Sequence, residues 1–302
     1  MTVAAHNPVE IEFGQSTDPG LDPAKRINED AHGYHQTKFG HLFVLCDGMG
    51  GHAGGKEASE LAVRTIFEVF DGATIEREPV DVLVEAIREA GRKVYAFGGK
   101  AGNMGRPGST CVAALLHQGY AEIAHVGDSR AYAIRARQIY RLTRDHSMVQ
   151  ELIDGGVITE KEALGHPDSN KITRALGMSP EVDVEARTEP LELYPGDLLV
   201  LASDGLTDLA RNEDILVTAT EYFRERDVQA ASDELVALAN RRGGHDNITV
   251  QVVHVLDPGL KPGQTMAQEP PPGRVADTIV DPIAPPRELA ETDPGLPADL
   301  TG

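Results

Sequence analysis

Four aspartates stand where strand-like segments end or begin, and carboxylates placed in this way can bind metal ions. Asp47, Asp128 and Asp204 each follow an apolar segment within two residues, and Asp246 comes just before another one. Because the end of one strand and the start of its antiparallel neighbour lie at the same edge of a sheet, the four side chains could converge at one rim. Carboxylates that converge raise one another's pKa values unless a cation neutralises them. The pattern therefore indicates a site for divalent metal ions.

Each of these acidic turns also has a simpler interpretation, since Asp-Gly is a preferred dipeptide of tight turns. Their combination favours metal binding, above all because Asp47 and Asp204 end the apolar segments 42–46 and 198–202, where burying a charge is costly. No cluster of histidine or cysteine accompanies the carboxylates in the sequence. Ligands that are all oxygen favour magnesium or manganese over zinc.

The elements that must position these carboxylates follow from the hydrophobic pattern. Helical spacing of apolar residues indicates two long helices near residues 58–69 and 83–94. Strand-like segments occur at residues 42–46, 110–115, 121–126, 131–134, 198–202 and 248–253. They form adjacent pairs rather than alternating with helices, which favours antiparallel sheets covered by helices over a doubly wound parallel sheet. From His146 to about Leu176 the pattern loosens, which indicates a surface insertion that shapes access to the site.

Composition and charge exclude several classes of function. The chain has 302 residues, 48 of them acidic and 28 basic, and a formal net charge of -20 that repels nucleic acids and anionic membranes. No apolar stretch approaches the roughly 20 residues of a spanning helix, and residues 1–12 lack a secretory signal pattern. Cys46 and Cys111 lie in apolar segments, and two such thiols provide neither a disulfide framework nor a zinc site. We therefore expect a cytoplasmic monomer that binds neither nucleic acid nor membrane.

The composition changes once, near Asp257. Residues 258–302 hold ten of the nineteen prolines and no aromatic residue, so they can bury little apolar surface. We predict one catalytic domain, residues 1–257, followed by a disordered, acidic, proline-rich tail, residues 258–302. Thr278 in this tail belongs to a Thr-x-x-Asp sequence, the form that phosphothreonine-binding forkhead-associated domains recognise. Our hypothesis is that a kinase phosphorylates Thr278 and that such a domain then docks there.

Several short motifs occur in one order between about residues 8 and 256. They are Arg26-Ile27-Asn28-Glu29-Asp30, Asp47-Gly48-Met49-Gly50-Gly51-His52, Gly108-Ser109-Thr110, Val126-Gly127-Asp128-Ser129-Arg130, Ser203-Asp204-Gly205-Leu206-Thr207-Asp208 and Asp246-Asn247-Ile248-Thr249. Together they resemble the metal-dependent serine/threonine protein phosphatase family (type 2C) in its bacterial form. The resemblance implies an α+β fold, a four-layer αββα sandwich whose two central antiparallel sheets are flanked by helices, with a flap at about residues 146–177.

The resemblance also implies which residues hold two manganese or magnesium ions. Asp47 would bridge both ions, and the backbone carbonyl of Gly48 would bind one of them. Glu29 would complete the ligands of that ion, largely through water, while Asp204 and Asp246 would hold the other.

Bacterial members of the family also bind a third ion, and Asp128 and Asp208, with the shared Asp204, stand at the matching positions. In such enzymes a hydroxide that bridges two ions attacks phosphoserine or phosphothreonine, because the ions lower the pKa of the shared water. Neither cysteine begins a Cys-x5-Arg sequence, so a covalent phosphocysteine mechanism is not indicated. The chain is thus predicted to dephosphorylate phosphorylated Ser/Thr proteins and to oppose a bacterial Ser/Thr protein kinase.

Two positions depart from the family pattern. The phosphate-binding arginine of the family falls at Lys25 here, with Arg26 one residue later. Lysine acts as a point charge, whereas a guanidinium clamps phosphate with two hydrogen bonds, so we favour Arg26 as the catalytic phosphate ligand and keep Lys25 as the alternative. Eukaryotic members carry a histidine where this chain has Met49, so metal-bound water is the expected donor of the proton to the leaving group.

Other polar residues near the motifs have structural interpretations. Arg130, two residues after Asp128, is predicted to form a structural ion pair rather than to clamp the substrate. His125 lies in an apolar strand and is predicted to be a satisfied core histidine. Because His146 lacks metal-ligand spacing to other histidines, we expect it in a turn or cap. Thr110 is expected to hydrogen-bond to the backbone that supports the metal ligands.

Two other functions compete with phosphatase activity. One is a regulatory member of the family that binds phosphoproteins without turnover, but such members usually lose a metal ligand, and Glu29, Asp47, Asp204 and Asp246 are all present. The other is a two-metal hydrolase of small phosphoesters or nucleic acid, which conflicts with the acidic charge and the absence of basic or aromatic stripes in the sequence.

Overall fold

The computed structural model of the chain describes residues 8–51, 53–99, 106–163, 166–223 and 227–259. Thr278 and nearly all of the predicted tail lie outside the described residues. Within the described part, every helix is too short or too polar to cross a membrane.

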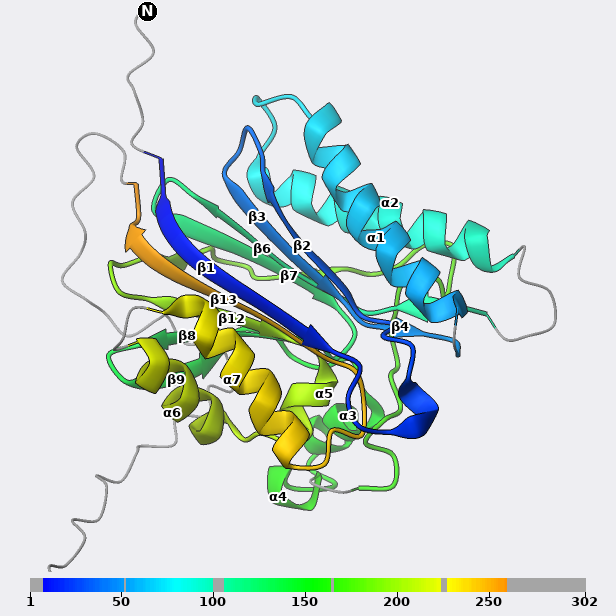
Figure 1. The fold of residues 1–302 in the computed structure, drawn as a ribbon. Coiled ribbons are helices and arrows are strands. Elements are labelled where there is room, and N and C mark those ends of the chain that lie inside the picture. The colour runs from blue at the N-terminus through cyan, green and yellow to red at the C-terminus, as the bar shows by residue number, and fades with distance from the viewer. Residues whose placement is uncertain (1–7, 52, 100–105, 164–165, 224–226, 260–302) are drawn as a thin grey trace, which may run out of the picture.

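Two antiparallel sheets form the centre of the molecule (Figure 1). The first has the strand order β1 (Glu10–Asp18), β13 (Ile248–Asp257), β12 (Leu198–Ala202), β8 (Arg130–Arg135) and β9 (Gln138–Arg141). The second has the order β10 (Glu185–Ala186), β7 (Tyr120–Val126), β6 (Cys111–His117), β3 (His41–Cys46) and β2 (Ala31–Gln36), and β11 (Leu191–Glu192) also pairs with β7. The strands β4 (Gly48–Met49) and β5 (Gly108–Ser109) pair with each other in a third, two-stranded sheet.

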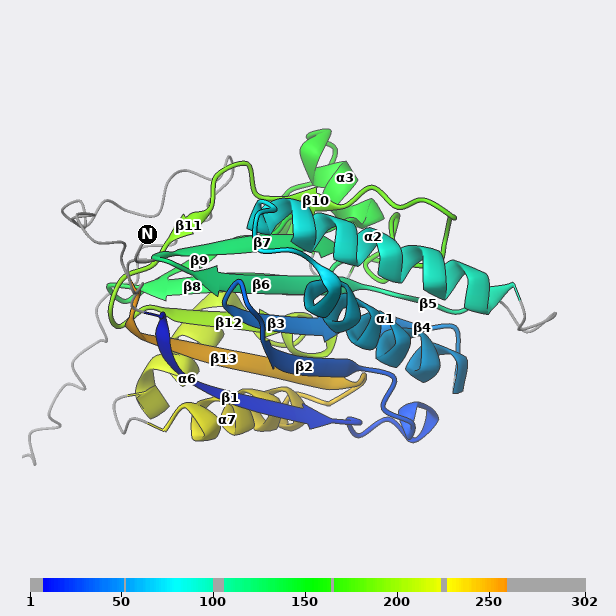
Figure 2. The same cartoon turned by 90° about the horizontal axis from the view of Figure 1, so that it is seen from above.

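Helices cover the outer face of each sheet (Figures 1 and 2). The long helices α1 (Ala53–Gly72) and α2 (Pro79–Gly98) lie on the second sheet, and α6 (Asn212–Phe223) and α7 (Val228–Arg241) lie on the first. The 3-10 helix η1 (Pro23–Lys25) precedes β2, and α5 (Asp204–Thr207) follows β12. The predicted four-layer αββα sandwich is confirmed, and so is its α+β class. Between β9 and β10 the flap carries the short helices α3 (Met148–Asp154) and α4 (Glu160–Ala163).

The apolar strands pack on both faces, which explains their unbroken hydrophobic sequences. In β12 the side chains of Leu198 and Val200 pack in the cluster beneath α6 and α7. Leu199 and Leu201, which alternate with them, pack in the cluster between the two sheets, as the two-residue period of a strand requires. Residues directly after or before such strands, unlike those within β12, are the first positions at which a side chain can turn away from this core.

Candidate metal centre

The predicted carboxylates lie on loops and one short helix at neighbouring strand ends. Asp47 directly follows β3, Asp128 follows β7, and Asp246 precedes β13. Asp204 is the first residue of α5 and Asp208 its C-cap, and a separation of four residues places these two side chains on one side of a helical turn. All five therefore come from segments that the two sheets hold at one end of the sandwich.

Electrostatic coupling shows that these carboxylates converge. Burial raises the pKa of Asp47 well above its usual value, and the carboxylates of Asp204, Asp30 and Asp128 raise it further. The pKa of Asp204 is raised in the same way, first by burial and then by Asp128, Asp208 and Asp246. Without a cation, such carboxylates keep protons at neutral pH. A bound cation stabilises their ionised form, because it neutralises their mutual repulsion.

Asp128 and Asp208 extend the acidic cluster on the side of the flap. Burial is the largest cause that raises the pKa of Asp128 to about 7, and Asp145 adds to it while Arg130 opposes it. Burial likewise raises the pKa of Asp208, against the opposing charges of Arg130 and His245. The two residues that the resemblance assigns to a third ion thus belong to the same coupled cluster.

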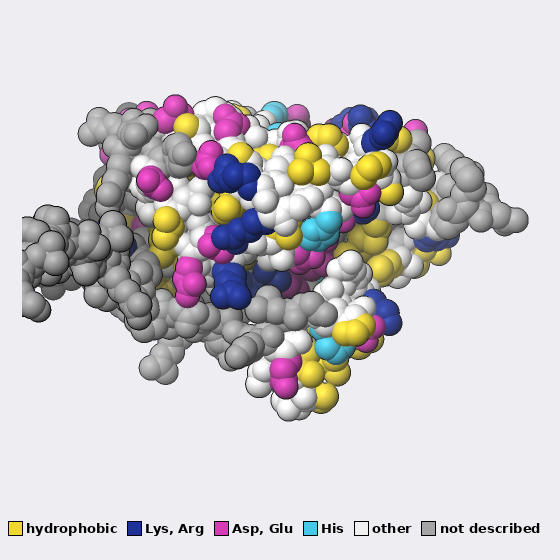
Figure 3. Space-filling view, turned by 60° about the horizontal axis from the view of Figure 1, so that its bottom comes forward, with side chains coloured by type: hydrophobic (Ala, Val, Ile, Leu, Met, Phe, Trp, Pro, Cys, Tyr) yellow, Lys and Arg dark blue, Asp and Glu magenta, His cyan; other side chains and the backbone are white. Residues whose placement is uncertain are grey.

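Unpartnered oxygens indicate that the cluster fits divalent ions. Oδ1 of Asp30, Oδ1 of Asp128 and Oδ1 of Asp204 are all shielded from solvent and accept no hydrogen bond from any described residue. Buried carboxylate oxygens without a donor are costly, and hard divalent cations take such oxygens as ligands. Figure 3 shows this face of the molecule hollowed, with acidic side chains deep in the hollow and lysine and arginine side chains along its edge. The residues present therefore fit magnesium or manganese.

The backbone of Asp47 is held from two sides. Its N–H donates to Oγ1 of Thr110 over 2.9 Å, and its carbonyl accepts from the backbone N–H of Thr110 at 2.8 Å. Oγ of Ser109 donates to the same carbonyl at 3.0 Å. Oγ1 of Thr110 lies 2.7 Å from Oγ of Ser129, in the loop after Asp128. The predicted supporting role of Thr110 is confirmed.

Glu29 is fixed through its backbone and through a close approach of α1. Its N–H donates to Oδ1 of Asn247 at 2.8 Å, and its carbonyl accepts from Oγ of Ser59 and from the N–H of Gly48 at 2.5 and 3.2 Å. A Cβ atom added to Gly55 would lie 2.1 Å from Oε2 of Glu29. The first turn of α1 can approach the Glu29 carboxylate this closely only because residue 55 is glycine.

Asp30 is a member of the cluster to which the sequence analysis assigned no role. Its Oδ2 accepts a hydrogen bond from Oγ of Ser203 at 2.9 Å. Burial is the largest cause that raises its pKa to about 6. The signal in the sequence was its position directly after Glu29, but only the packing of the two sheets shows that it faces Asp47 and Asp246.

Of the two candidate phosphate ligands, the structure places Lys25 against the cluster. Nζ of Lys25 lies 2.8 and 3.0 Å from the two carboxylate oxygens of Asp246. Burial alone would lower the pKa of Lys25, but Asp246, Asp47 and Asp204 outweigh it and raise that pKa. Arg26, the next residue, forms no ion pair with a described residue.

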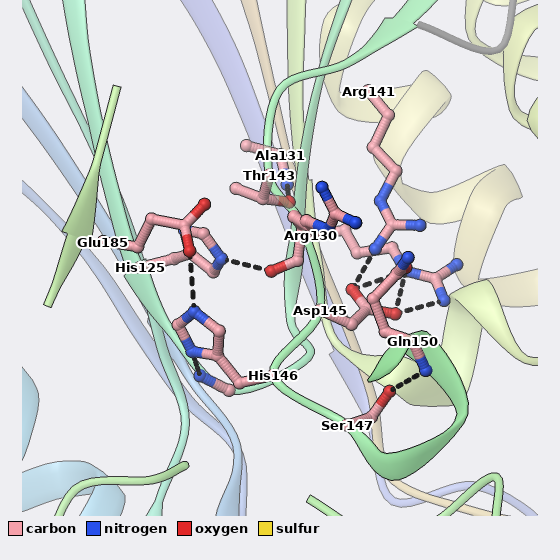
Figure 4. Close-up of polar contacts among 12 residues, drawn as sticks. His125, Arg130, Ala131, Arg141, Thr143, Asp145, His146, Ser147, Gln150 and Glu185 are labelled. Carbon is pink, nitrogen blue, oxygen red and sulfur yellow. Dashed lines mark hydrogen bonds and ion pairs between the residues drawn. The ribbon is translucent and has the colours of Figure 1, made fainter. Parts of the chain in front are cut away.

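Arg130 has a structural role, as predicted. Nε and Nη2 of Arg130 bind the carboxylate of Asp145 at 3.1 and 2.7 Å, and Arg141 binds the same carboxylate (Figure 4). Burial alone would raise the pKa of Asp145, but the two guanidinium groups outweigh it and hold that pKa at about 2. His125 is buried and its Nε2 donates to the carbonyl of Arg144 at 2.6 Å, so the prediction of a satisfied core histidine is also confirmed.

Known proteins resemble this chain in sequence and in fold. The family model of protein phosphatase 2C matches residues 24–239. The serine/threonine phosphatase stp of Listeria monocytogenes is 35% identical over 233 residues, which are 75% of this chain and 89% of the relative. The structure of the Streptococcus agalactiae serine/threonine phosphatase superposes with a TM-score of 0.72 at 35% identity, covering 82% of this chain and 100% of that one. A catalytic domain of the phosphatase PstP in complex with two manganese ions is 32% identical, with a TM-score of 0.68 and coverage of 82% and 99%.

Proposed function

The chain belongs to the protein phosphatase 2C family and is a serine/threonine protein phosphatase, and we propose that the carboxylates around Asp47 hold the divalent ions that it uses. The observation that carries this proposal is the set of converging carboxylates with raised pKa values and unpartnered oxygens. When bound, such ions supply a water that ionises near neutral pH and neutralise charge on the phosphoryl group. The side chains of the cluster would bind these ions and fix their positions.

The proposed ligands divide between two adjacent ions. Asp47 lies at the centre of the cluster and would contact both ions, with the carbonyl of Gly48 and the carboxylate of Glu29 on one side. Asp204 and Asp246 would complete the other side. The ions are manganese or magnesium, because every proposed donor is an oxygen atom. Asp128 and Asp208, with Asp204, are the proposed ligands of a third ion, supported by the raised pKa values that link them.

We propose that Lys25, rather than Arg26, binds the substrate phosphate. We favoured Arg26 from the sequence. The contact of Nζ of Lys25 with the carboxylate of Asp246 supports the change to Lys25. Replacing Lys25 with alanine is expected to raise KM for a phosphothreonine peptide about tenfold, since a hydrogen bond to a charged group contributes about 1.5–3 kcal/mol. Replacing Arg26 with alanine should change KM less than about threefold.

Steady-state kinetics on both alanine variants and on Lys25→Arg provide the measurement. The arginine variant should recover most of the affinity, because it retains the positive charge. A large increase of KM in Arg26→Ala together with normal kinetics in Lys25→Ala would return the assignment to Arg26.

We propose that the substrates are phosphoserine and phosphothreonine proteins made by a bacterial Ser/Thr kinase, which this enzyme would oppose. Hydrolysis by the full chain with manganese should be compared on three substrates, a phosphothreonine peptide, the matched phosphotyrosine peptide and a nucleoside monophosphate. Turnover confined to the phosphothreonine peptide is expected. Preferred hydrolysis of the nucleotide would favour a small-phosphoester hydrolase, and binding of the phosphopeptide without turnover would favour a regulatory protein.

A further inference from the structure

A second cluster of ligand-type side chains lies beside the carboxylates, where the flap meets β7. One ligand atom of each of His125, His146 and Glu185 lies within 4.8 Å of the others. Figure 4 shows the two imidazole rings one above the other, with the ring of His146 pointing toward Glu185 from β10. This cluster is not needed to hold the ions proposed above, so it requires its own explanation.

The hydrogen bonds of His146 exclude a metal ion at this cluster. Its Nδ1 accepts the backbone N–H of Gly127 at 3.0 Å. Its Nε2 lies 3.1 Å from Oε2 of Glu185 and 3.1 Å from Nη1 of Arg174, so both ring nitrogens already have partners. The rings of His125 and His146 are stacked, with centroids 4.7 Å apart and planes 15° apart. Since the lone pairs of imidazole lie in the ring plane, two stacked rings do not point at one ion. His146 is therefore a hydrogen-bonding residue here.

His146 holds the loop that carries Asp128. Besides the bond to Nδ1, the carbonyl of Gly127 accepts the backbone N–H of His146 at 2.9 Å. Gly127 has a φ of +103°, and a Cβ atom at this position would lie 2.6 Å from Cγ2 of Thr110. The backbone just before Asp128 is thus clamped between His146 and Thr110, the residue that also supports Asp47.

His146 also closes the base of the flap. Its carbonyl accepts the N–H of Thr173 at 2.8 Å, and Ser147 pairs with Ile172 in an isolated antiparallel bridge. Leu176, three residues after Thr173, exchanges two backbone hydrogen bonds with Ser109, of 3.0 and 2.8 Å. The two ends of the flap are therefore joined to each other at His146 and then to the loops that support Asp128 and Asp47.

Glu185 and His125 fix the ring of His146 in the orientation that this contact needs. Oε2 of Glu185 lies 3.1 Å from Nε2, while His125 covers one face of the ring and donates its own Nε2–H to the carbonyl of Arg144. Burial and the neighbouring His146 lower the pKa of His125 to about 4, so it is neutral and adds no competing charge at physiological pH.

We propose that His146 is a positioning residue that couples the flap to the third-ion site, holding Asp128 ready to bind that ion through the backbone of Gly127. The proposal rests on the proposed function in one respect, since Asp128 is taken as an ion ligand. Loss of the Nδ1 contact is expected to weaken binding of the third ion and not of the other two. Supporting residues around metal ligands contribute about 10–100-fold to affinity.

Two substitutions separate the two hydrogen bonds of the ring. His146→Asn can place an oxygen where Nδ1 lies, which keeps the Gly127 contact and loses the Glu185 contact. His146→Gln can place a donor near Nε2, which keeps the Glu185 contact and loses the Gly127 contact. The full chain is titrated with Mn²⁺, and free Mn²⁺ is measured by electron paramagnetic resonance. This gives the number of bound ions and their affinities. Asp128→Asn serves as the reference variant that is expected to lose the third ion.

We expect His146→Gln to lower the affinity for the third Mn²⁺ ion by about tenfold and to leave the affinities for the other two ions close to those of the wild type. In His146→Asn all three affinities should stay close to wild type. Equal weakening in both variants, or none in His146→Gln, would overturn the proposal. If the wild-type chain itself binds no manganese, the proposed function fails instead.

Hydrogen exchange on the wild-type chain makes the test independent of how the variants fold. The amide hydrogens of Gly127 and Thr173 both bond to His146, so they should exchange with solvent at similar rates. Exchange at Gly127 that is much faster than at Thr173 would contradict the coupling.

Discussion

Replacing Asp47 with asparagine is expected to lower kcat/KM toward a phosphothreonine peptide by about 10³-fold or more. Asp47 follows β3 directly and is coupled to the carboxylates of Asp204, Asp30 and Asp128, so no other side chain can take its central place. Stabilisation of charge by metal ions contributes several kcal/mol to such reactions, and each 1.36 kcal/mol corresponds to a factor of ten in rate. Kinetics at saturating manganese measure the effect.

A stability measurement separates loss of chemistry from loss of folding in this variant. Without metal, Asp47→Asn should raise the melting temperature, because it removes one of several repelling carboxylates from a buried cluster. Asp71→Asn is the matched control, since Asp71 is an exposed carboxylate that contacts His35 far from the cluster, and its kinetics should match wild type. Full activity in Asp47→Asn would refute the proposed centre, and a lower metal-free melting temperature would show that Asp47 is not under repulsion.

Removing the metal is expected to make the protein less stable as the pH rises from about 6.5 to 8. The pKa of Asp128 is raised to about 7 and that of Asp30 to about 6, against about 3.9 in the unfolded chain. Asp47 and Asp204 are raised as well. The folded metal-free chain therefore holds more protons than the unfolded chain, and its free energy of unfolding falls as these protons are lost.

The choice of pH window removes most of an opposing contribution from His125. Its pKa is lowered to about 4 in the folded state, so it adds stability mainly as the pH rises from about 4 to 6.5 and only about 0.4 kcal/mol above that. Between pH 6.5 and 8 each extra proton that the folded chain still holds should lower the free energy of unfolding by about 1.4 kcal/mol per pH unit. Saturating manganese should abolish the decrease, because it stabilises the charged carboxylates.

Melting curves with chelator and with manganese across this range are the measurement, and activity should disappear with chelator and return with metal. A metal-free melting temperature that stays level or rises with pH would contradict the coupled cluster. Phosphatase activity that survives complete chelation would contradict the dependence on metal.

The positions of the proposed metal ligands could be predicted because they depend on local sequence. The segment 198–202 is apolar at every position, which indicates a strand buried on both faces, and Asp204 follows where such a strand must end. The same reasoning applies to Asp47 after β3 and to Asp128 after β7. Their order and spacing also identified the family, so the fold followed from the resemblance.

Contacts between distant segments could not be predicted in this way. The choice between Lys25 and Arg26 depends on a contact with Asp246, which lies 221 residues further along the chain. His146 appeared to be a turn or capping residue, because nothing in the sequence places it against Gly127. Asp30 gained its role only when Ser203 and Asp47 were seen to lie beside it.

The sequence by itself determined which segments are buried strands, which acidic residues stand at their ends, and that these residues suit divalent ions. Those properties follow from side-chain periodicity and from the cost of burying charge, which act within a few residues. Only the tertiary structure decided which cation faces Asp246, which oxygens lack a donor, and how the flap is joined to Asp128. These features arise where two sheets bring segments that are distant in the sequence within hydrogen-bonding distance. A local sequence pattern cannot predict such contacts.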